Sequence, residues 1–153
     1  MGLRHWFVLA CLAGNAWPQN ADRRPVRLAV HLLVACGTAG AGAAVQVAGG
    51  PPRCLERKPF LTQDDVQSAE VHPGSQGRHL VLLTFHEEAA IRELQVTLKN
   101  IGNRVGIVLD GRVVGTPRIT SGSRLLYIDG GFSQPQAEEV VAAFNRRLYG
   151  QRK

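Results

Sequence analysis

The most regular apolar pattern in the chain predicts a hairpin at residues 103–119, which read NRVGIVLDGRVVGTPRI. Its arms, 105–109 and 112–119, flank Asp110-Gly111. Asp-Gly between apolar runs favours a tight turn because glycine readily adopts the positive φ that the turn requires. Pro117 has no N–H to donate to a neighbouring strand, so we expect the second arm to end or to reach a sheet edge there. Neither arm carries a catalytic group, so the hairpin is interpreted as scaffold.

Three further strands and two amphipathic helices are predicted around this hairpin. Strands are expected near residues 70–72, over RHLVLLTF at 78–85 and over RLLYIDG at 124–130. Apolar residues recur at helical spacing in two further segments, one between the strand at 78–85 and the hairpin, and one after the strand at 124–130. The residues predicted to be buried are Ile91, Leu94, Leu98 and Ile101 in the first helix, and Ala137, Val140, Val141, Phe144 and Leu148 in the second. The pairs Thr62–Asp65, Thr84–Glu87 and Ser133–Gln136 have the spacing of capping boxes and are expected at helix starts.

The order of elements from residue 60 onward is therefore β-β-α-β-β-β-α. Hairpin-linked strands with two amphipathic helices predict an α+β fold, in which both helices pack on one face of an antiparallel sheet.

The N-terminal 36 residues have the pattern of an export signal. Basic residues at 23, 24 and 27 precede a short apolar run that ends in Leu33-Val34-Ala35-Cys36. The last four residues resemble the bacterial lipobox, so we expect Cys36 to be acylated and to become the mature N-terminus. Plain secretion, a single anchor and a chance cysteine remain alternatives. An earlier stretch ends in its own Val8-Leu9-Ala10-Cys11, so either the true start lies downstream of Met1, which we favour, or this first segment is the working signal.

Residues 37–59 are expected to form a flexible tether, because GTAGAGAAVQVAGGPPR at 37–53 offers too little apolar surface to order itself. The folded unit is then expected at 60–150, with a basic tail at 151–153. Acylation of Cys36 would leave Cys54 as the single cysteine of the mature chain, so no internal disulfide and no role for Cys54 are expected.

The charge distribution argues against a nucleic-acid partner. The chain carries a formal charge of +6, but residues 60–150 hold nine Lys/Arg and ten Asp/Glu, so the predicted folded unit has no basic surplus.

Candidate chemistry is weak throughout the sequence. His72, His79 and His86 recur every seven residues but fall in different predicted elements, and they are interpreted as surface histidines rather than metal ligands. Asp64-Asp65 and Glu87-Glu88 lie where helix starts favour negative charge. We therefore expect a protein that is not an enzyme, with no catalytic residues, no cofactor and no metal.

Three stretches in combination resemble a known family. They are LTQDDVQSAEV, then LTFHEEAAIRELQVTLKNIGNRVGIVLDGRVVGTPRI, and finally YIDGGFSQPQAEEVVAAFNRRL. Together they are similar to the head subdomain of the first periplasmic domain of SecD, the SecDF protein-export component. The resemblance covers about ninety of the 153 residues.

The resemblance implies a function in the cell envelope. SecD proteins carry six transmembrane helices that couple to the proton gradient, and none is evident here, so we expect a stand-alone head without that motor. The resemblance implies a non-enzymatic module that binds extended or unfolded polypeptide and works with translocation components. Its lipid anchor would hold it on the extracytoplasmic face of the plasma membrane. The residues expected at the polypeptide-binding region are Pro117, Arg118, Ile119 and Arg124. The alternative is an envelope lipoprotein that uses the same fold to bind or regulate an unrelated membrane partner.

Overall fold

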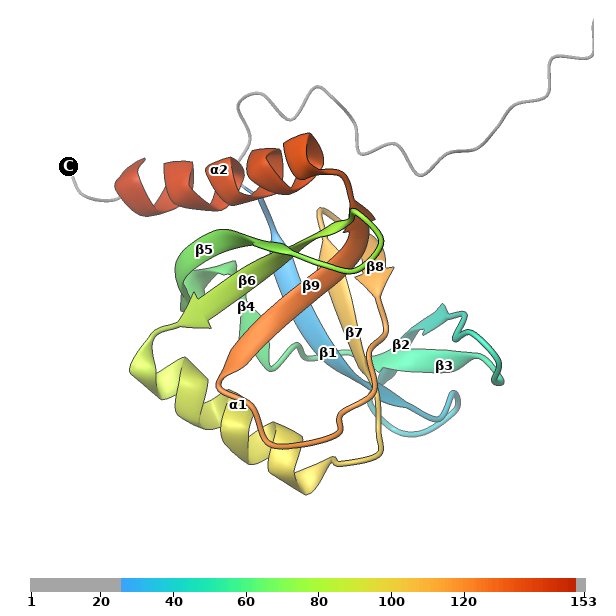
Figure 1. The fold of residues 1–153 in the computed structure, drawn as a ribbon. Coiled ribbons are helices and arrows are strands. Elements are labelled where there is room, and N and C mark those ends of the chain that lie inside the picture. The colour runs from blue at the N-terminus through green and yellow to red at the C-terminus, as the bar shows by residue number, and fades with distance from the viewer. Residues whose placement is uncertain (1–25, 151–153) are drawn as a thin grey trace, which may run out of the picture.

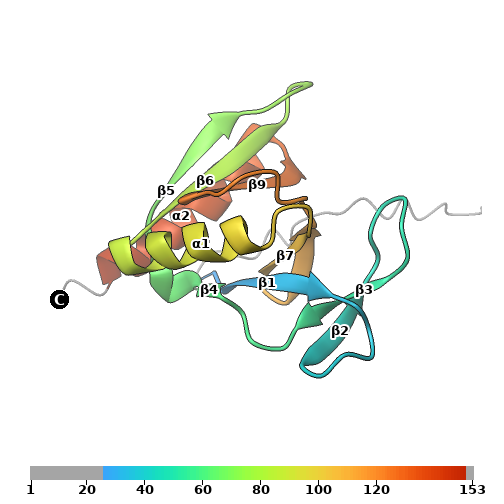
Figure 2. The same cartoon turned by 90° about the horizontal axis from the view of Figure 1, so that it is seen from below.

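The computed structural model describes residues 26–150, shown in Figures 1 and 2. This range contains nine strands, one 3-10 turn and two α-helices. The strands are β1 (Leu28–Val34), β2 (Ala41–Val45), β3 (Arg53–Glu56), β4 (Leu61–Thr62), β5 (Val66–Pro73), β6 (His79–Phe85), β7 (Val105–Leu109), β8 (Arg112–Gly115) and β9 (Leu125–Phe132). The turn is η1 (Gln63–Asp65), and the helices are α1 (Glu87–Lys99) and α2 (Gln134–Gly150).

The strands form two antiparallel sheets. The six-stranded sheet has the order β2-β3-β1-β7-β8, with β4 also paired to β1, and the three-stranded sheet has the order β5-β6-β9. Asp110 and Gly111 have φ values of 48° and 80°, which is the geometry of the tight turn predicted between β7 and β8. Strand β8 ends at Gly115, two residues before Pro117, as the sequence predicted.

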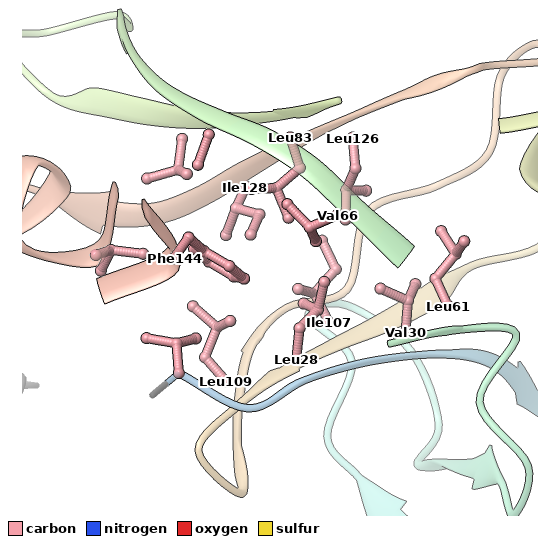
Figure 3. Close-up of a cluster of buried hydrophobic side chains, with 14 of the residues drawn as sticks. Leu28, Val30, Leu61, Val66, Leu83, Ile107, Leu109, Leu126, Ile128 and Phe144 are labelled. Atoms are coloured by element: carbon pink, nitrogen blue, oxygen red, sulfur yellow. The ribbon is translucent and has the colours of Figure 1, made fainter. Parts of the chain in front are cut away.

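The hydrophobic core lies between the two sheets. Figure 3 shows Leu28, Ile107 and Leu109 of the larger sheet meeting Leu83 and Ile128 of the smaller one. Helix α2 adds Phe144 to this cluster (Figure 3), and its buried residues Ala137 and Val140 belong to the stripe that the sequence predicted. The core therefore depends on both sheets, on one face of α2 and on Ala89 and Ala90 of α1.

The α+β class, the antiparallel strands and the two helices are confirmed, and the order from β5 onward is the predicted β-β-α-β-β-β-α. The arrangement differs in one respect, because the strands divide between two sheets. The physical reason is that β7 pairs with β1, a strand from outside the predicted folded unit, rather than with β5, β6 or β9. Both helices contribute buried residues to the one core cluster between these sheets, α1 through Ala89 and Ala90 and α2 through Phe144.

The predicted buried stripe of α1 is wrong. Its buried residues are Ala89, Ala90, Glu93 and Thr97. The apolar residues Ile91, Leu94, Leu98 and Ile101, called the α1 stripe below, lie toward solvent, three of them classed as exposed and Leu94 half-buried. Both sets of residues have helical spacing, so periodicity could not decide between them. Among the described residues, neither helix combines the length and the apolar composition that crossing a bilayer requires.

The structure contradicts the second half of the export leader predicted at residues 1–36. Residues 28–34 form β1, the strand of the larger sheet that pairs with β3, β4 and β7. A short apolar run suits both a signal peptide and a buried strand, which explains the misreading. Processing at Cys36 would remove β1 from the fold. Residues 1–25, with the possible downstream start, and the predicted basic tail at 151–153 lie outside the described residues.

The predicted tether at 37–59 and the lipidation of Cys36 are corrected as well. Residues 41–45 and 53–56 form the antiparallel pair β2–β3, which projects away from the helices in Figures 1 and 2. Cys36 is bonded to Cys54 in a disulfide, so its sulfur is not free to carry a lipid, and Cys54 has the role that the sequence did not assign. The disulfide supplies order that the Gly/Ala composition of this segment does not.

Two of the three predicted capping boxes are confirmed. The backbone N–H of Thr62 donates to Asp65 Oδ2 at 2.8 Å at the start of η1, and that of Ser133 donates to Gln136 Oε1 at 2.9 Å before α2. The pair Thr84–Glu87 is not a cap, because pairing with β5 keeps residues up to Phe85 in strand β6. Helix α1 instead begins after His86, whose side chain makes no capping hydrogen bond.

Candidate functional site

A pocket of about 230 Å³ lies between α1, the start of β9 and the segment that connects β8 to β9. It is called the Glu93 pocket below. Its floor includes the buried side chains of Val30, Val105 and Leu126. Around them lie Phe60, Glu93, Thr97, Pro117, Arg118, Ile119, Thr120, Ser121, Ser123, Leu125 and Tyr127.

Hydrogen bonds fix the connecting segment as one wall of this pocket. Its first half continues the β7–β8 hairpin, since Ile119 N–H donates to Asn103 O and Gly102 N–H donates to Ile119 O, both at 2.8 Å. Its second half is held against α1, because Ser123 N–H donates to Thr97 Oγ1 at 3.0 Å. Figure 1 shows this segment running beside α1 before it enters β9. The pocket wall is therefore built by the fold and not by a free loop.

Glu93 is the unusual residue of the pocket. Its side chain is 3% exposed, and its Oε2 atom is buried without a hydrogen-bond partner among the described residues. Burial disfavours the charged form and raises the pKa of Glu93 from 4.5 to about 7. Around neutral pH this carboxyl group is therefore partly protonated, so it can both donate and accept a hydrogen bond.

We expect Glu93 to make the stability of the fold depend on pH. Because the folded-state pKa is raised, stability is full below about pH 4.5 and is lost as pH rises through about 7. The loss amounts to about 3 kcal/mol by pH 8. Glu93→Gln removes the ionisable group. Urea unfolding should therefore give the wild type and the variant equal free energies of unfolding at pH 4.5, and the variant the larger value at pH 8.

The matched control is Glu88→Gln, which makes the same chemical change at an exposed position of the same helix. Its unfolding free energy should follow that of the wild type across this pH range. Equal pH dependence in the wild type and in Glu93→Gln would contradict the assignment.

Strand β9 borders the pocket as an edge strand. It pairs with β6 on one side, and no other described strand is hydrogen-bonded to it. Leu125 and Tyr127, which line the pocket from β9, are also exposed apolar residues. The α1 stripe is adjacent to the pocket wall. A Cβ atom added at Gly122, in the connecting segment, would lie within 3 Å of the Leu94 and Leu98 side chains. The pocket, the strand edge and exposed apolar groups thus lie together.

The residues predicted from sequence fall on this pocket with one difference. Pro117, Arg118 and Ile119 line it, whereas Arg124 is exposed and is not part of its lining. Sequence reasoning missed Glu93, Thr97 and the β9 residues. The available signal was that Ala90, Glu93 and Thr97 also have helical spacing, which marks a second possible buried face of α1.

The three histidines are not brought together. His72 contacts Glu70 at 3.7 Å and packs edge-on against Tyr127, His79 lies on β6, and His86 precedes α1. Within residues 26–150 there is no group of three His, Cys, Asp or Glu side chains arranged to hold a metal ion. The acidic pair of η1 has a structural role, since Asp64 pairs with Arg147 of α2 and Asp65 pairs with Arg92 of α1.

Comparison with known proteins gives consistent matches. Residues 42–146 match the family model described as SecDF, P1 head subdomain. The protein translocase subunit SecDF of Thermus thermophilus is 41% identical over 87 residues, which is 54% of this chain and 12% of that protein. The protein translocase subunit SecD of Acidaminococcus fermentans is 30% identical over 66 residues, covering 43% of this chain and 16% of that protein. The chain therefore spans less than a fifth of the length of these relatives.

Two solved structures are also similar over 81% of this chain, each with a TM-score of 0.60. One is described as a membrane component SecDF that enhances protein export; it is 26% identical, and 64% of its chain is covered. The other is SecDF in a super-membrane-facing form, which is 27% identical over 19% of its chain.

Proposed function

Because this chain belongs to the family of SecDF P1 head subdomains, we propose that it binds extended segments of polypeptide during protein export, in the Glu93 pocket and along β9. The observation that carries the proposal is the position of the pocket, directly beside the unpaired edge of an antiparallel sheet. An extended peptide can add to such an edge through main-chain hydrogen bonds, while a neighbouring pocket receives a side chain.

The chemistry of the pocket suits an unfolded chain of variable sequence. Main-chain hydrogen bonds to β9 do not depend on the ligand's side chains, and Leu125 and Tyr127 offer apolar contact to whichever residues lie over them. Inside the pocket, the unpartnered Glu93 Oε2 can accept a hydrogen bond from a ligand N–H or donate one to a ligand carbonyl when protonated. No bond-making step is needed, so the proposed function is binding and not catalysis.

The proposed location is the extracytoplasmic side of the membrane, where translocation components are the proposed partners. The Cys36–Cys54 disulfide supports this location, since disulfides persist in oxidising compartments and are rare in the cytosol. With Cys36 in the fold, the Val8-Leu9-Ala10-Cys11 segment is the other candidate for lipidation in this sequence.

A direct test is fluorescence anisotropy with a labelled peptide of alternating apolar and polar residues. We expect Leu125→Ser to weaken binding about tenfold, since a buried leucine contact contributes about 1.5–3 kcal/mol. Val113→Ser is the matched control, because Val113 on β8 has the same 40% exposure as Leu125 and lies outside the pocket lining. Equal affinities of the two variants would contradict binding at this site.

A second peptide separates strand addition from simple apolar contact. Methylation of alternate backbone nitrogens removes the N–H groups that would pair with β9 and leaves the side chains unchanged. We expect the methylated peptide to bind much more weakly than the parent. Unchanged affinity would show that the β9 edge is not used.

The second candidate function is docking of one folded membrane partner. The α1 stripe favours it, because Ile91 and Leu98 are exposed on one face of α1 and Ile101 is exposed just after the helix ends. Crosslinking from α1 to a single folded protein, with no binding of extended peptides, would favour this candidate over the first.

A further inference from the structure

A second pocket, of about 240 Å³, shares Arg118 with the Glu93 pocket and is rich in arginine. It is formed between residues 47–53, which join β2 to β3, and residues 102–104, which precede β7. Its charged side chains are Arg53, Arg104 and Arg118, and no carboxylate lines it. We call it the arginine pocket.

Two of these arginines are cross-strand neighbours. Arg104 and Arg118 form an isolated antiparallel bridge, which puts their Cβ atoms about 5 Å apart on the same face. Two positive side chains therefore start from one face at this bridge, with no carboxylate beside them in the pocket lining.

Backbone carbonyls hold all three guanidinium groups in place. Arg53 Nη2 donates to Leu33 O at 3.3 Å, Arg104 Nη1 to Thr116 O at 2.7 Å, and Arg118 Nη1 to Gly102 O at 2.9 Å. A guanidinium has five N–H donors, so each group keeps donors for a ligand. Arg53 Nε in particular is buried and has no hydrogen-bond partner among the described residues.

The cluster does not follow from a generally basic surface. Residues 26–150 contain thirteen Lys/Arg and eleven Asp/Glu, so the described part of the chain is close to neutral. Elsewhere Arg92 and Arg147 are paired with aspartates. Among residues 26–150, none of the three arginines of this pocket forms an ion pair, although two of the three are half-buried.

We propose that the arginine pocket binds a phosphate group. Arginine forks match the geometry of phosphate oxygens and form charge-assisted hydrogen bonds with them, and three positive charges suit a dianion better than a single carboxylate. With a volume of about 240 Å³, the pocket has room for a phosphate and part of an attached organic group. A soluble phosphate compound and a phospholipid headgroup share this chemistry.

The first experiment titrates the full chain, labelled with ¹⁵N, with inorganic phosphate, using chloride at equal ionic strength as the reference. The Nε–H resonances of Arg53 and Arg104 are expected to shift and to saturate with phosphate and not with chloride. The same non-saturating shifts with both anions would overturn the proposal.

Variants then locate the site. Arg104→Gln and Arg53→Gln should each weaken phosphate binding about tenfold or more, since a charge-assisted hydrogen bond is lost in each. Arg112→Gln is the matched control, because it removes the same charge at an exposed position on β8 outside the pocket. If Arg104→Gln fails to fold, Arg53→Gln serves alone. Equal phosphate affinity in the folded pocket variants and the control would overturn the proposal.

A vesicle arm distinguishes the two sources of phosphate. Sedimentation with phosphatidylglycerol vesicles, compared with phosphatidylcholine vesicles, measures lipid binding by the same variants. Binding that Arg53→Gln abolishes and Arg112→Gln retains would assign a lipid headgroup. Phosphate binding without any vesicle binding would assign a soluble phosphate compound.

Discussion

Leu28→Ala is expected to destabilise the fold by about 2–5 kcal/mol, the range for a leucine truncated in a packed core. Leu28 is 2% exposed and lies in the cluster between the two sheets (Figure 3), although its position in the sequence suggests a cleaved signal. A urea unfolding curve of the purified chain measures the effect.

The matched control for this prediction is Leu98→Ala, which removes the same atoms from a side chain that is 55% exposed on the α1 stripe. Its unfolding free energy should stay within about 0.5 kcal/mol of the wild type. If Leu28→Ala were equally harmless, β1 would not belong to the folded core.

Loss of the Cys36–Cys54 disulfide is expected to cost about 3 kcal/mol. The bond closes a segment with a sequence separation of 18 residues, and the chain-entropy model gives this value for a loop of that length. The double variant Cys36→Ser/Cys54→Ser should therefore unfold at a lower urea concentration than the wild type under oxidising conditions.

Reductant provides the control for the disulfide. It should lower the stability of the wild type to that of the double variant and leave the double variant unchanged. Digestion of the oxidised protein without reductant, followed by mass spectrometry, should also show a peptide pair linked through Cys36 and Cys54. A free or acylated Cys36 in the membrane fraction would contradict this pairing and restore the lipid anchor.

Local sequence signals determined much of the second half of the fold. Asp110-Gly111 specified the β7–β8 turn, because few other residue pairs accept positive φ at both positions. The spacing of Ala137, Val140 and Phe144 specified the buried face of α2, because the competing faces of that helix carry charged and polar residues. The segments that resemble the family include the β7–β8 turn and α2. Because local sequence specifies these elements, the resemblance could be recognised from the sequence.

Contacts between distant segments decided what the sequence left open. Whether residues 28–34 are a signal or a strand depends on β7, which lies more than seventy residues later and provides the pairing partner. The Ala90–Glu93–Thr97 face and the α1 stripe have equally regular spacing, and packing against distant segments determines which face is buried. Ala90 joins the core cluster, and Thr97 Oγ1 accepts a hydrogen bond from Ser123 N–H.

The sequence by itself therefore determined the α+β class, the order of elements from β5 onward, the β7–β8 turn and the family. The tertiary structure alone decided the role of β1, the Cys36–Cys54 pairing, the Glu93 pocket and the arginine pocket. The physical reason is the range of the interactions. Turn geometry and helical periodicity act over a few residues, whereas strand pairing, a disulfide and a pocket each join residues that the sequence separates widely.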